Sequence, residues 1–460
     1  MRAGVACRIS GTRPEVATRE NTVRASLLRL LITGATPGCG TQDYGVGLVG
    51  GWVTGRLDLS FARARGRTLL DACHFVERPM LPEADLNELS LDRSYLPGLS
   101  AEGMRIQGNL LLNGVTAKGT VDLNGAKIGG RMACDGATLE GPKIDGKQGM
   151  ALIAQRLDVV KSLFWRKVTV TSGTVTLAAA RVGDLVDDGR WPDAVDVLRL
   201  DGFTYDRIVG ADAPVTAAGR QGWLRAGSVW KGRFLPQPYT QLARVFRSMG
   251  LSGEARTVLY WREGLVARQA RWEVLRGGAN AHWWSLPFRA LAFVGMLAGD
   301  IALRWVAGYG YRPLNGVIAL ALLCGAAFWV ADRTWHEGQF APNSDVVLTS
   351  DGWRAALARD CVQDPGLPLP APCVANPAEA WSGDPLHGMD WESFSPWGYA
   401  LDLVVPILDL GQTDAWAPSK DRGWWGFHLW YLRWVFAVAG WLVTALGAAA
   451  VTGIMQRDRE

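Results

Sequence analysis

The chain has 460 residues, enough for two or three domains, and a formal net charge of +4 at pH 7. This small charge excludes a globally basic, nucleic-acid-binding composition. Of the 22 tryptophans, 16 lie between Trp272 and Trp441, and aromatic side chains concentrate at membrane interfaces. We therefore expect the C-terminal half to be membrane-associated.

The N-terminal segment, residues 1–44, contains RASLLRLLI at 24–32, which predicts a short helix that caps the following domain. No secretory signal peptide is expected, because this segment has no long apolar core. Next comes GVGLVGGWVTGRLDLS, in which Gly45, Gly47 and Gly50 have the G-x-G-x-x-G spacing of a dinucleotide-binding turn.

A nucleotide-binding turn must open a helix. Here Leu57 and Leu59 alternate with charged residues, which is the spacing of a strand. We therefore interpret the glycines as corners of a repeat and keep a cofactor site there only as the alternative.

An eleven-residue repeat supports this interpretation. IQGNLLLNGVT, AKGTVDLNGAK and IGGRMACDGAT, residues 106–138, align without gaps and read G-x-apolar-x-apolar-x-G. Each apolar pair predicts one inward face of a short strand, with glycines at the turns. The pattern predicts a right-handed β-solenoid over residues 45–222, in which 76–105 and 187–222 fit poorly and are interpreted as insertions.

Residues 223–284 form a basic neck, with helical periodicity over 236–276 and a turn at MGLSG that together predict a helical hairpin. From 215 to 313 there are 14 Lys or Arg and 4 Asp or Glu. Beside a membrane such a stretch predicts contact with anionic lipid.

Two runs without charge, 314–331 and 434–454, are long enough to cross a bilayer. The apolar run 290–299 is short and flanked by charges, so residues 285–313 are predicted to form an interfacial helix. We thus expect two transmembrane helices, an external loop domain at 332–433 and a short tail at 455–460.

Charge predicts the orientation of these segments. Residues 333–429 hold 5 Lys or Arg against 13 Asp or Glu, so the positive-inside rule places this loop outside a bacterial inner membrane and both termini in the cytoplasm. Of the seven cysteines, Cys361 and Cys373 flank a proline-rich loop, and an external location would permit a disulfide between them.

One further segment, YALDLVVPILDLGQ at 399–412, is apolar but interrupted by Pro406. We favour a helix that lies on the outer surface of the bilayer. The alternative is a re-entrant segment with Asp402 on its helix and Asp409, Gly411 and Gln412 at its tip, as in a pore.

GRLDLS, GTVDLNGAKIGG and RMACDGATLEG, then PQPYTQLARVFRSMGLSGEARTVL, GYGYRP and LDLVVPILDLGQ resemble a group of bacterial membrane proteins. These carry a pentapeptide-like solenoid, and some bear the label "membrane-associated oxidoreductase". The resemblance implies this architecture and no particular catalytic residue.

The functional hypothesis is a membrane-anchored scaffold or sensor that presents a cytoplasmic solenoid to a protein partner. We expect no cofactor, no metal and no nucleic acid, and a homo-oligomer is compatible with the sequence. Two alternatives stay open: an oxidoreductase with an unrecognised cofactor site, and an oligomeric channel with two spans per chain.

Overall fold

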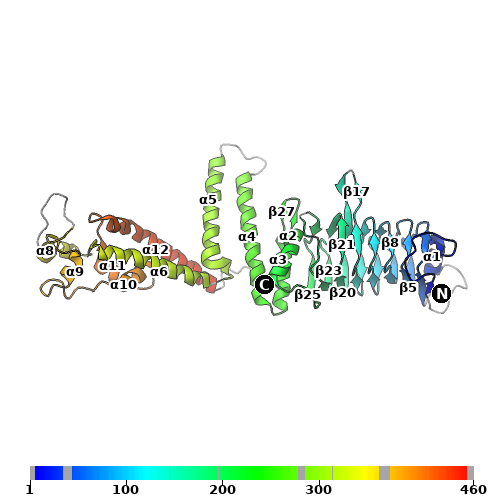
Figure 1. The fold of residues 1–460 in the computed structure, drawn as a ribbon, viewed down its shortest axis with the longest axis horizontal. Coiled ribbons are helices and arrows are strands. Elements are labelled where there is room, and N and C mark those ends of the chain that lie inside the picture. Colours follow the sequence, from blue (N-terminus) through cyan, green and yellow to red (C-terminus); the bar gives the residue numbers. More distant parts are fainter. Residues whose placement is uncertain are drawn as a thin grey trace. The chain divides into compact units, whose positions relative to one another are not determined.

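The computed structural model describes residues 6–34, 44–144, 146–194, 196–277, 285–312, 314–361 and 373–452. These residues form two compact units that divide between Gln269 and Ala270. Unit 1 is a parallel β-solenoid followed by helices, and unit 2 is largely helical (Figure 1).

The solenoid strands stack, turn upon turn, into three parallel sheets of 11, 7 and 5 strands among the described residues. The first sheet contains β1 (Cys7–Arg8), β3 (Gly45–Val49), β5 (Arg63–Asp71), β7 (Asp85–Ser90), β10 (Arg105–Ile106), β11 (Leu110–Leu111), β14 (Lys127–Ile128), β15 (Met132–Ala133), β20 (Asp158–Trp165), β23 (Arg181–Asp187) and β25 (Thr204–Ile208). The second contains β2 (Thr22–Arg24), β4 (Trp52–Thr54), β6 (His74–Phe75), β8 (Tyr95–Leu96), β12 (Thr116–Ala117), β16 (Thr138–Glu140) and β21 (Thr169–Ser172). The third contains β9 (Leu99–Ser100), β13 (Val121–Asp122), β19 (Met150–Ile153), β22 (Thr174–Thr176) and β24 (Leu198–Arg199).

One turn of the solenoid in its most regular part is two sequence repeats long. Leu110 pairs with Met132, and Thr116 pairs with Thr138, in each case 22 positions further along the chain. Four short strands, β10 to β13, lie on such a turn before β14 returns beside β10. The eleven-residue repeat is therefore half a turn.

Inward side chains of the repeat form the solenoid core. Leu110, Val121 and Met132 are at most 1% exposed. Gly114 and Gly125 turn the chain with φ of +62° and +66°, a conformation that glycine adopts without a steric penalty. The repeat thus encodes both the packed face and the corners of each turn.

The solenoid is longer and more continuous than the sequence predicts. Residues 76–105, interpreted as an insertion, contain β7 to β10, which pair in register with neighbouring turns. Two strands of the N-terminal segment, β1 and β2, already belong to the stack. Helix α1 (Ala25–Thr33) packs Ala25, Leu28 and Ile32 against it. A hairpin of β17 (Lys143–Ile144) and β18 (Lys147–Gln148) interrupts the parallel pairing after β16.

Helices close the C-terminal end of the solenoid. They are α2 (Ala217–Gly227), α3 (Gln237–Ser248) and α4 (Ser252–Arg276), with a hairpin of β26 (Val229–Trp230) and β27 (Arg233–Phe234) after α2. The predicted hairpin over 236–276 corresponds to α3 and α4, and the turn between them contains Gly250 with φ of +81°. Leu242, Phe246 and Val258 are 0% exposed. These helices therefore bury an apolar stripe.

Unit 2 contains the long apolar helices. They are α5 (Leu286–Ala302), α6 (Leu314–His336) and α12 (Trp424–Val451). The expectation of two membrane-length helices is wrong: among the described residues three stretches are long and apolar enough, Leu286–Gly310, Leu314–His336 and Trp424–Ala450.

The first of these helices continues past Asp300, which directly follows the apolar run 290–299. Asp300 forms an ion pair with Arg271 of α4 at 2.5 Å and accepts a hydrogen bond from the Tyr309 hydroxyl. Because both partners satisfy its carboxylate, Asp300 does not interrupt the helix. A π-helical turn (Leu303–Ala307) and a 3₁₀ turn (Gly308–Gly310) then bend the chain, so that α5 extends away from one end of the α6 and α12 pair in a different direction (Figure 1).

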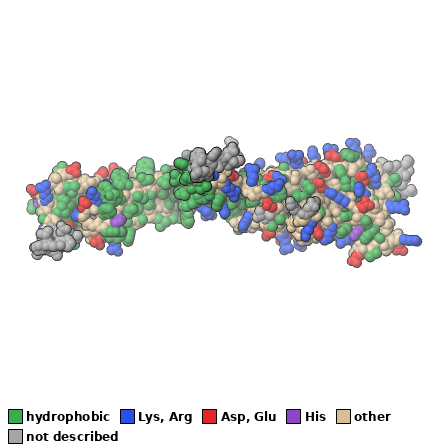
Figure 2. Space-filling view, turned by 90° about the horizontal axis from the view of Figure 1, so that it is seen from above, with side chains coloured by type: hydrophobic (Ala, Val, Ile, Leu, Met, Phe, Trp, Pro, Cys, Tyr) green, Lys and Arg blue, Asp and Glu red, His purple; other side chains and the backbone are tan. Residues whose placement is uncertain are grey.

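Helices α6 and α12 pack against each other in opposite directions. Gly316, near the start of α6, lies so close to Gly447, near the end of α12, that an added Cβ would be 3.3 Å from its Cα. Small residues allow this close approach between helices in membranes. The outer faces are apolar and exposed, as Leu322 (69%) and Val438 (69%) show. Figure 2 shows apolar side chains gathered over this unit, whereas charged side chains are scattered over the solenoid.

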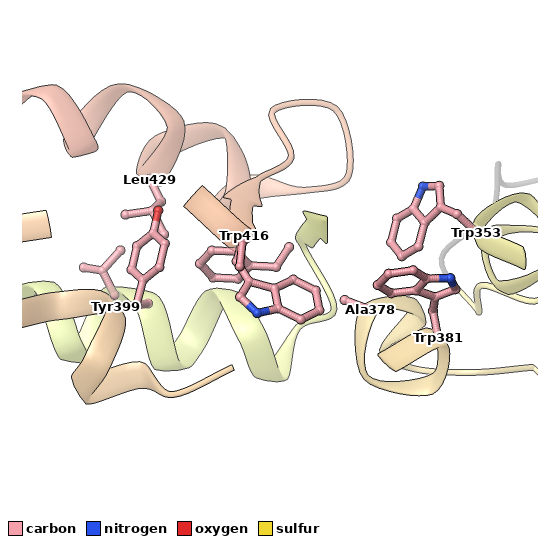
Figure 3. Close-up of a cluster of buried hydrophobic side chains, with 10 residues drawn as sticks. Trp353, Ala378, Trp381, Tyr399, Trp416 and Leu429 are labelled. Atoms are coloured by element: carbon pink, nitrogen blue, oxygen red, sulfur yellow. The ribbon is translucent and has the colours of Figure 1, made fainter. Parts of the chain in front are cut away.

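A tryptophan-rich domain, residues 337–423, connects α6 to α12. Its elements are β28 (Phe340–Pro342), α7 (Asp345–Leu348), α8 (Asp351–Leu357), α9 (Pro377–Ser382), α10 (Pro396–Val404), α11 (Gln412–Ala415) and β29 (Trp416–Pro418), and β28 pairs with β29. Trp353 and Trp381 meet edge to face at 5.9 Å, and Trp416 is fully buried. Figure 3 shows these rings with Tyr399 and Leu429 of α12. The domain core is thus continuous with the ends of α6 and α12.

Candidate functional site

The glycine triplet lies within the solenoid. Gly45 opens β3 with φ of +83°, and a Cβ there would be 2.0 Å from the Arg67 carbonyl oxygen. A Cβ on Gly47 would be 2.7 Å from that of Ala6, and one on Gly50 would be 2.5 Å from the Ser10 carbonyl oxygen. Strand β4 follows these glycines, not a helix. Neighbouring turns of the chain fill the space that a pyrophosphate would need.

Cys73 and Cys134 of the solenoid are buried free thiols. Burial raises the pKa of both Cys73 and Cys134 to about 12, so at neutral pH they stay protonated, whereas redox reactions of cysteine use the thiolate. An oxidoreductase would have to use other groups.

Cys361 and Cys373 are joined in a disulfide, with an S–S distance of 2.13 Å. Backbone hydrogen bonds support the joined ends: the Cys361 N–H donates to the Val374 carbonyl at 3.1 Å, and the Val374 N–H donates to that of Arg359 at 2.7 Å. The proline-rich loop between the cysteines lies outside the described residues. The ring is closed at the periphery of the tryptophan-rich domain.

Also on this domain, Asp384 accepts a hydrogen bond from the Leu386 N–H at 2.9 Å and lies 2.9 Å from Nδ1 of His387. These contacts, the backbone one first, hold the pKa of Asp384 below its usual range. Within the described ranges, no three His, Cys, Asp or Glu side chains are arranged to hold a metal ion.

The segment 396–412 is the least expected feature of unit 2. Ser395 caps α10 by accepting a hydrogen bond from the Gly398 N–H at 3.1 Å, and Pro396 occupies the first turn. Ala400 and Val404 of α10 are buried against Cys324 and Ala327 of α6 and Phe436 of α12. Helix α10 therefore inserts beside the middle of both long helices.

Helix geometry gives the position along α12 at which α10 makes contact. An added Cβ on Gly440 would be 1.8 Å from the Val404 carbonyl oxygen, so the two backbones are in direct contact. Gly440 lies 16 residues after Trp424, about 24 Å along α12. The C-terminal end of α10 thus reaches more than halfway along α12.

Polar side chains hold the returning chain against α10. Asp402 accepts hydrogen bonds from the Leu410 N–H at 3.0 Å and from the N–H and hydroxyl of Thr413 at 2.8 and 3.0 Å. Asp409 is exposed and accepts one from the Gly411 N–H at 3.3 Å. Asp402 is therefore a structural acceptor that fixes the bend.

The Gln412 side chain contacts residues that directly precede α10. Its amide nitrogen donates to the Ser393 carbonyl at 2.9 Å, and its oxygen accepts from the Ser395 N–H at 2.9 Å. Gly411, with φ of +71°, turns the chain just before it. The chain between the end of α10 and Gly411 is largely apolar, and Ile407 in this stretch is 81% exposed.

Sequence reasoning missed a buried ion pair where the solenoid meets α2. Asp187 and Arg220 are both fully buried, with Nη1–Oδ2 and Nη2–Oδ1 distances of 2.5 and 2.7 Å. Trp191 Nε1 donates to the same carboxylate at 2.6 Å, and Arg220 Nε donates to the Pro214 carbonyl at 2.8 Å. The partners are 33 residues apart, and neither stands in a recognisable motif.

Comparison with known proteins gives no match to a family model, to a curated protein or to a solved structure. What the geometry defines is the class: a β-solenoid protein with helices long and apolar enough for membrane association. Its function must be argued from its own residues.

Proposed function

We propose that this chain is a membrane-anchored scaffold or sensor whose solenoid binds a protein partner in the bacterial cytoplasm. One observation carries the proposal: a polar, stacked solenoid is followed in the same chain by long helices whose apolar faces are exposed. Such faces need lipid or protein to cover them. Neither unit holds an evident catalytic constellation among the described residues.

In the proposed arrangement, α6 and α12 cross the membrane as an antiparallel pair and α5 lies in the cytoplasmic interface. The bend at Gly308–Gly310 and the different direction in which α5 extends support this arrangement, and the neck arginines would face anionic lipid. The tryptophan-rich domain, with its disulfide, would lie outside. Segment 396–412 would then be re-entrant.

Reporters fused to the N-terminus and inserted at Asn343 test this arrangement. Two crossing helices between them, α5 and α6, would place both reporters on one side of the membrane. Crossing by α6 alone would place them on opposite sides, with the N-terminal one in the cytoplasm. Reporters on the same side would refute the interfacial position of α5.

The scaffold role is tested by photo-crosslinkers on the solenoid surface. Phe61 and Val160 are 77% and 65% exposed on unit 1, and a crosslinker at either should trap one adduct of defined mass in cells. A crosslinker in place of the buried Leu110 is the matched control. If no exposed solenoid position yields a discrete adduct, the partner-binding role is wrong.

A second candidate is an oligomeric channel, which the insertion of α10 beside α6 and α12 favours. Two crossing helices cannot enclose a pore, so several chains would have to place their 396–412 segments around one axis. Reconstituted protein should then conduct ions, and Asp409→Asn should change the selectivity. Electrically silent bilayers would remove this candidate.

A further inference from the structure

A groove of about 410 Å³ lies in unit 1 between the last solenoid turns and α3. One wall is formed by Arg181 of β23 and by Thr204 and Asp206 of β25. Gln241, Arg244 and Ser248 of α3 are on the other wall. The volume is within the range of pockets that hold small organic molecules.

The fold fixes both walls of this groove. Arg181 and Thr204 are direct partners in the parallel pairing of β23 with β25. Arg244 and Ser248 are four residues apart on α3 and therefore share one helix face. Gln241, which is 8% exposed, donates from Nε2 to the Tyr205 carbonyl at 2.7 Å and thereby holds α3 against the strand.

The two arginines of the groove, Arg181 and Arg244, differ from their neighbours in their ion pairs. Nearby arginines have partners: Arg207 pairs with Asp184 at 3.0 Å, and Arg199 pairs with Asp201 at 2.5 Å. Across the described ranges, neither Arg181 nor Arg244 has a carboxylate within ion-pair distance. Guanidinium groups bind phosphate with two parallel hydrogen bonds.

We propose that this groove binds a phosphate ester of a polyol. The phosphate lies between Arg181 and Arg244. The hydroxyls of Thr204 and Ser248 donate to the Ala180 and Val245 carbonyls at 3.4 and 2.8 Å in the free groove, and they turn to donate to the phosphate oxygens when the ligand binds. Asp206 cannot donate and repels a bare phosphate, so it accepts hydrogen bonds from hydroxyls of the ligand. The groove therefore selects an organic phosphate with free hydroxyl groups over inorganic phosphate.

Calorimetric titration of the full chain in neutral detergent with glycerol phosphate tests the proposal. Binding should weaken about tenfold or more in Arg244→Gln and in Arg181→Gln, because each removes charge-assisted hydrogen bonds. Arg233→Gln changes an exposed arginine of the same unit outside the groove and should bind like the parent chain. Asp206→Asn should narrow the preference for glycerol phosphate over inorganic phosphate.

The same chemistry occurs in a lipid headgroup, and native mass spectrometry distinguishes the two sources. If the ligand is a lipid, the parent chain should retain phosphatidylglycerol but not phosphatidylcholine, and Arg244→Gln should lose it. If the ligand is soluble, glycerol phosphate should bind, and Arg244→Gln should retain as much phosphatidylglycerol as the parent chain. Absence of both kinds of binding, or binding that neither arginine variant weakens, would overturn the proposal.

Discussion

The solenoid and the helical unit place their apolar side chains in opposite directions. In the solenoid, Leu110 and Val121 point inward and neighbouring turns cover them. In unit 2, α5 has no buried residue among those described, and Leu322 and Val438 remain open. Because the solenoid turns repeat along one axis, each turn buries apolar side chains of the next. The apolar faces of the long helices need lipid or another protein to cover them.

The two units also close their ends differently. At the C-terminal end of the solenoid, a buried ion pair, Asp187–Arg220, lies among stacked tryptophans. In unit 2, the ends of α6 and α12 enter the tryptophan-rich core. Substitutions at buried positions of each unit therefore test how that unit is packed.

The largest effect is expected from Val121→Asp in the solenoid core. A carboxylate at this 1% exposed position has no polar partner, so the solenoid should lose at least about 5 kcal/mol of stability. Thermal unfolding followed by circular dichroism in the strand region measures the loss. Gln107→Asp, on the exposed surface of the same turn, should leave the transition in place. An unchanged melting temperature in Val121→Asp would mean that the inward register is wrong.

The second largest loss of stability is expected from removal of one partner of the buried ion pair. Asp187→Leu leaves the Arg220 guanidinium buried without a counter-charge, at a cost of about 3–5 kcal/mol. The double variant Asp187→Leu, Arg220→Met should lose much less, since it leaves no buried charge. Urea unfolding of the singles and the double completes the cycle. A single-variant loss below about 1 kcal/mol, typical of exposed pairs, would contradict burial of this pair.

A smaller effect is expected where α10 meets α12. Gly440→Ala places a Cβ against the Val404 carbonyl and should push α10 away, at a cost of about 1–3 kcal/mol. In a Cys7→Ser background, Cys324 should then react faster with a maleimide. Gly295→Ala, whose Cβ would meet nothing within 4 Å, is the control. Equal reactivity in both variants would show that α10 does not cover Cys324.

The smallest effect concerns an aromatic stack on the solenoid surface. His74 stacks between Trp52 at 3.8 Å and Tyr95 at 4.5 Å. Burial and the nearby Arg13 lower the pKa of His74. The unfolded chain therefore binds the proton more readily.

The contribution of this histidine is consequently complete above its ordinary pKa of 6.5 and declines as the pH falls through the lower folded-state value. Melting temperatures measured from pH 7.5 down to pH 5 should decline slightly more in the parent chain than in His74→Tyr, which keeps the stack without the titration. Identical pH profiles would show that His74 makes no such contribution.

The sequence alone predicted the elements whose cause is local. Alternation of apolar residues with recurrent Gly114 and Gly125 predicted solenoid strands, helical periodicity predicted α3 and α4, and two uncharged runs predicted α6 and α12. Each of these patterns is repeated within a few residues, so the physical reason is visible in any short window.

Tertiary structure decided everything that depends on partners far apart in the chain. The eleven-residue repeat does not reveal that two repeats close one turn, because the pairing of Leu110 with Met132 exists only in the stack. Asp300 ends the apolar run 290–299 in the sequence, and only the fold brings Arg271 to pair with it. The insertion of α10 depends on contact with Gly440, and the Asp187–Arg220 pair depends on a side chain from another element. Pairings of this kind leave no periodic trace in the sequence, since their free energy comes from burial that only the assembled fold creates.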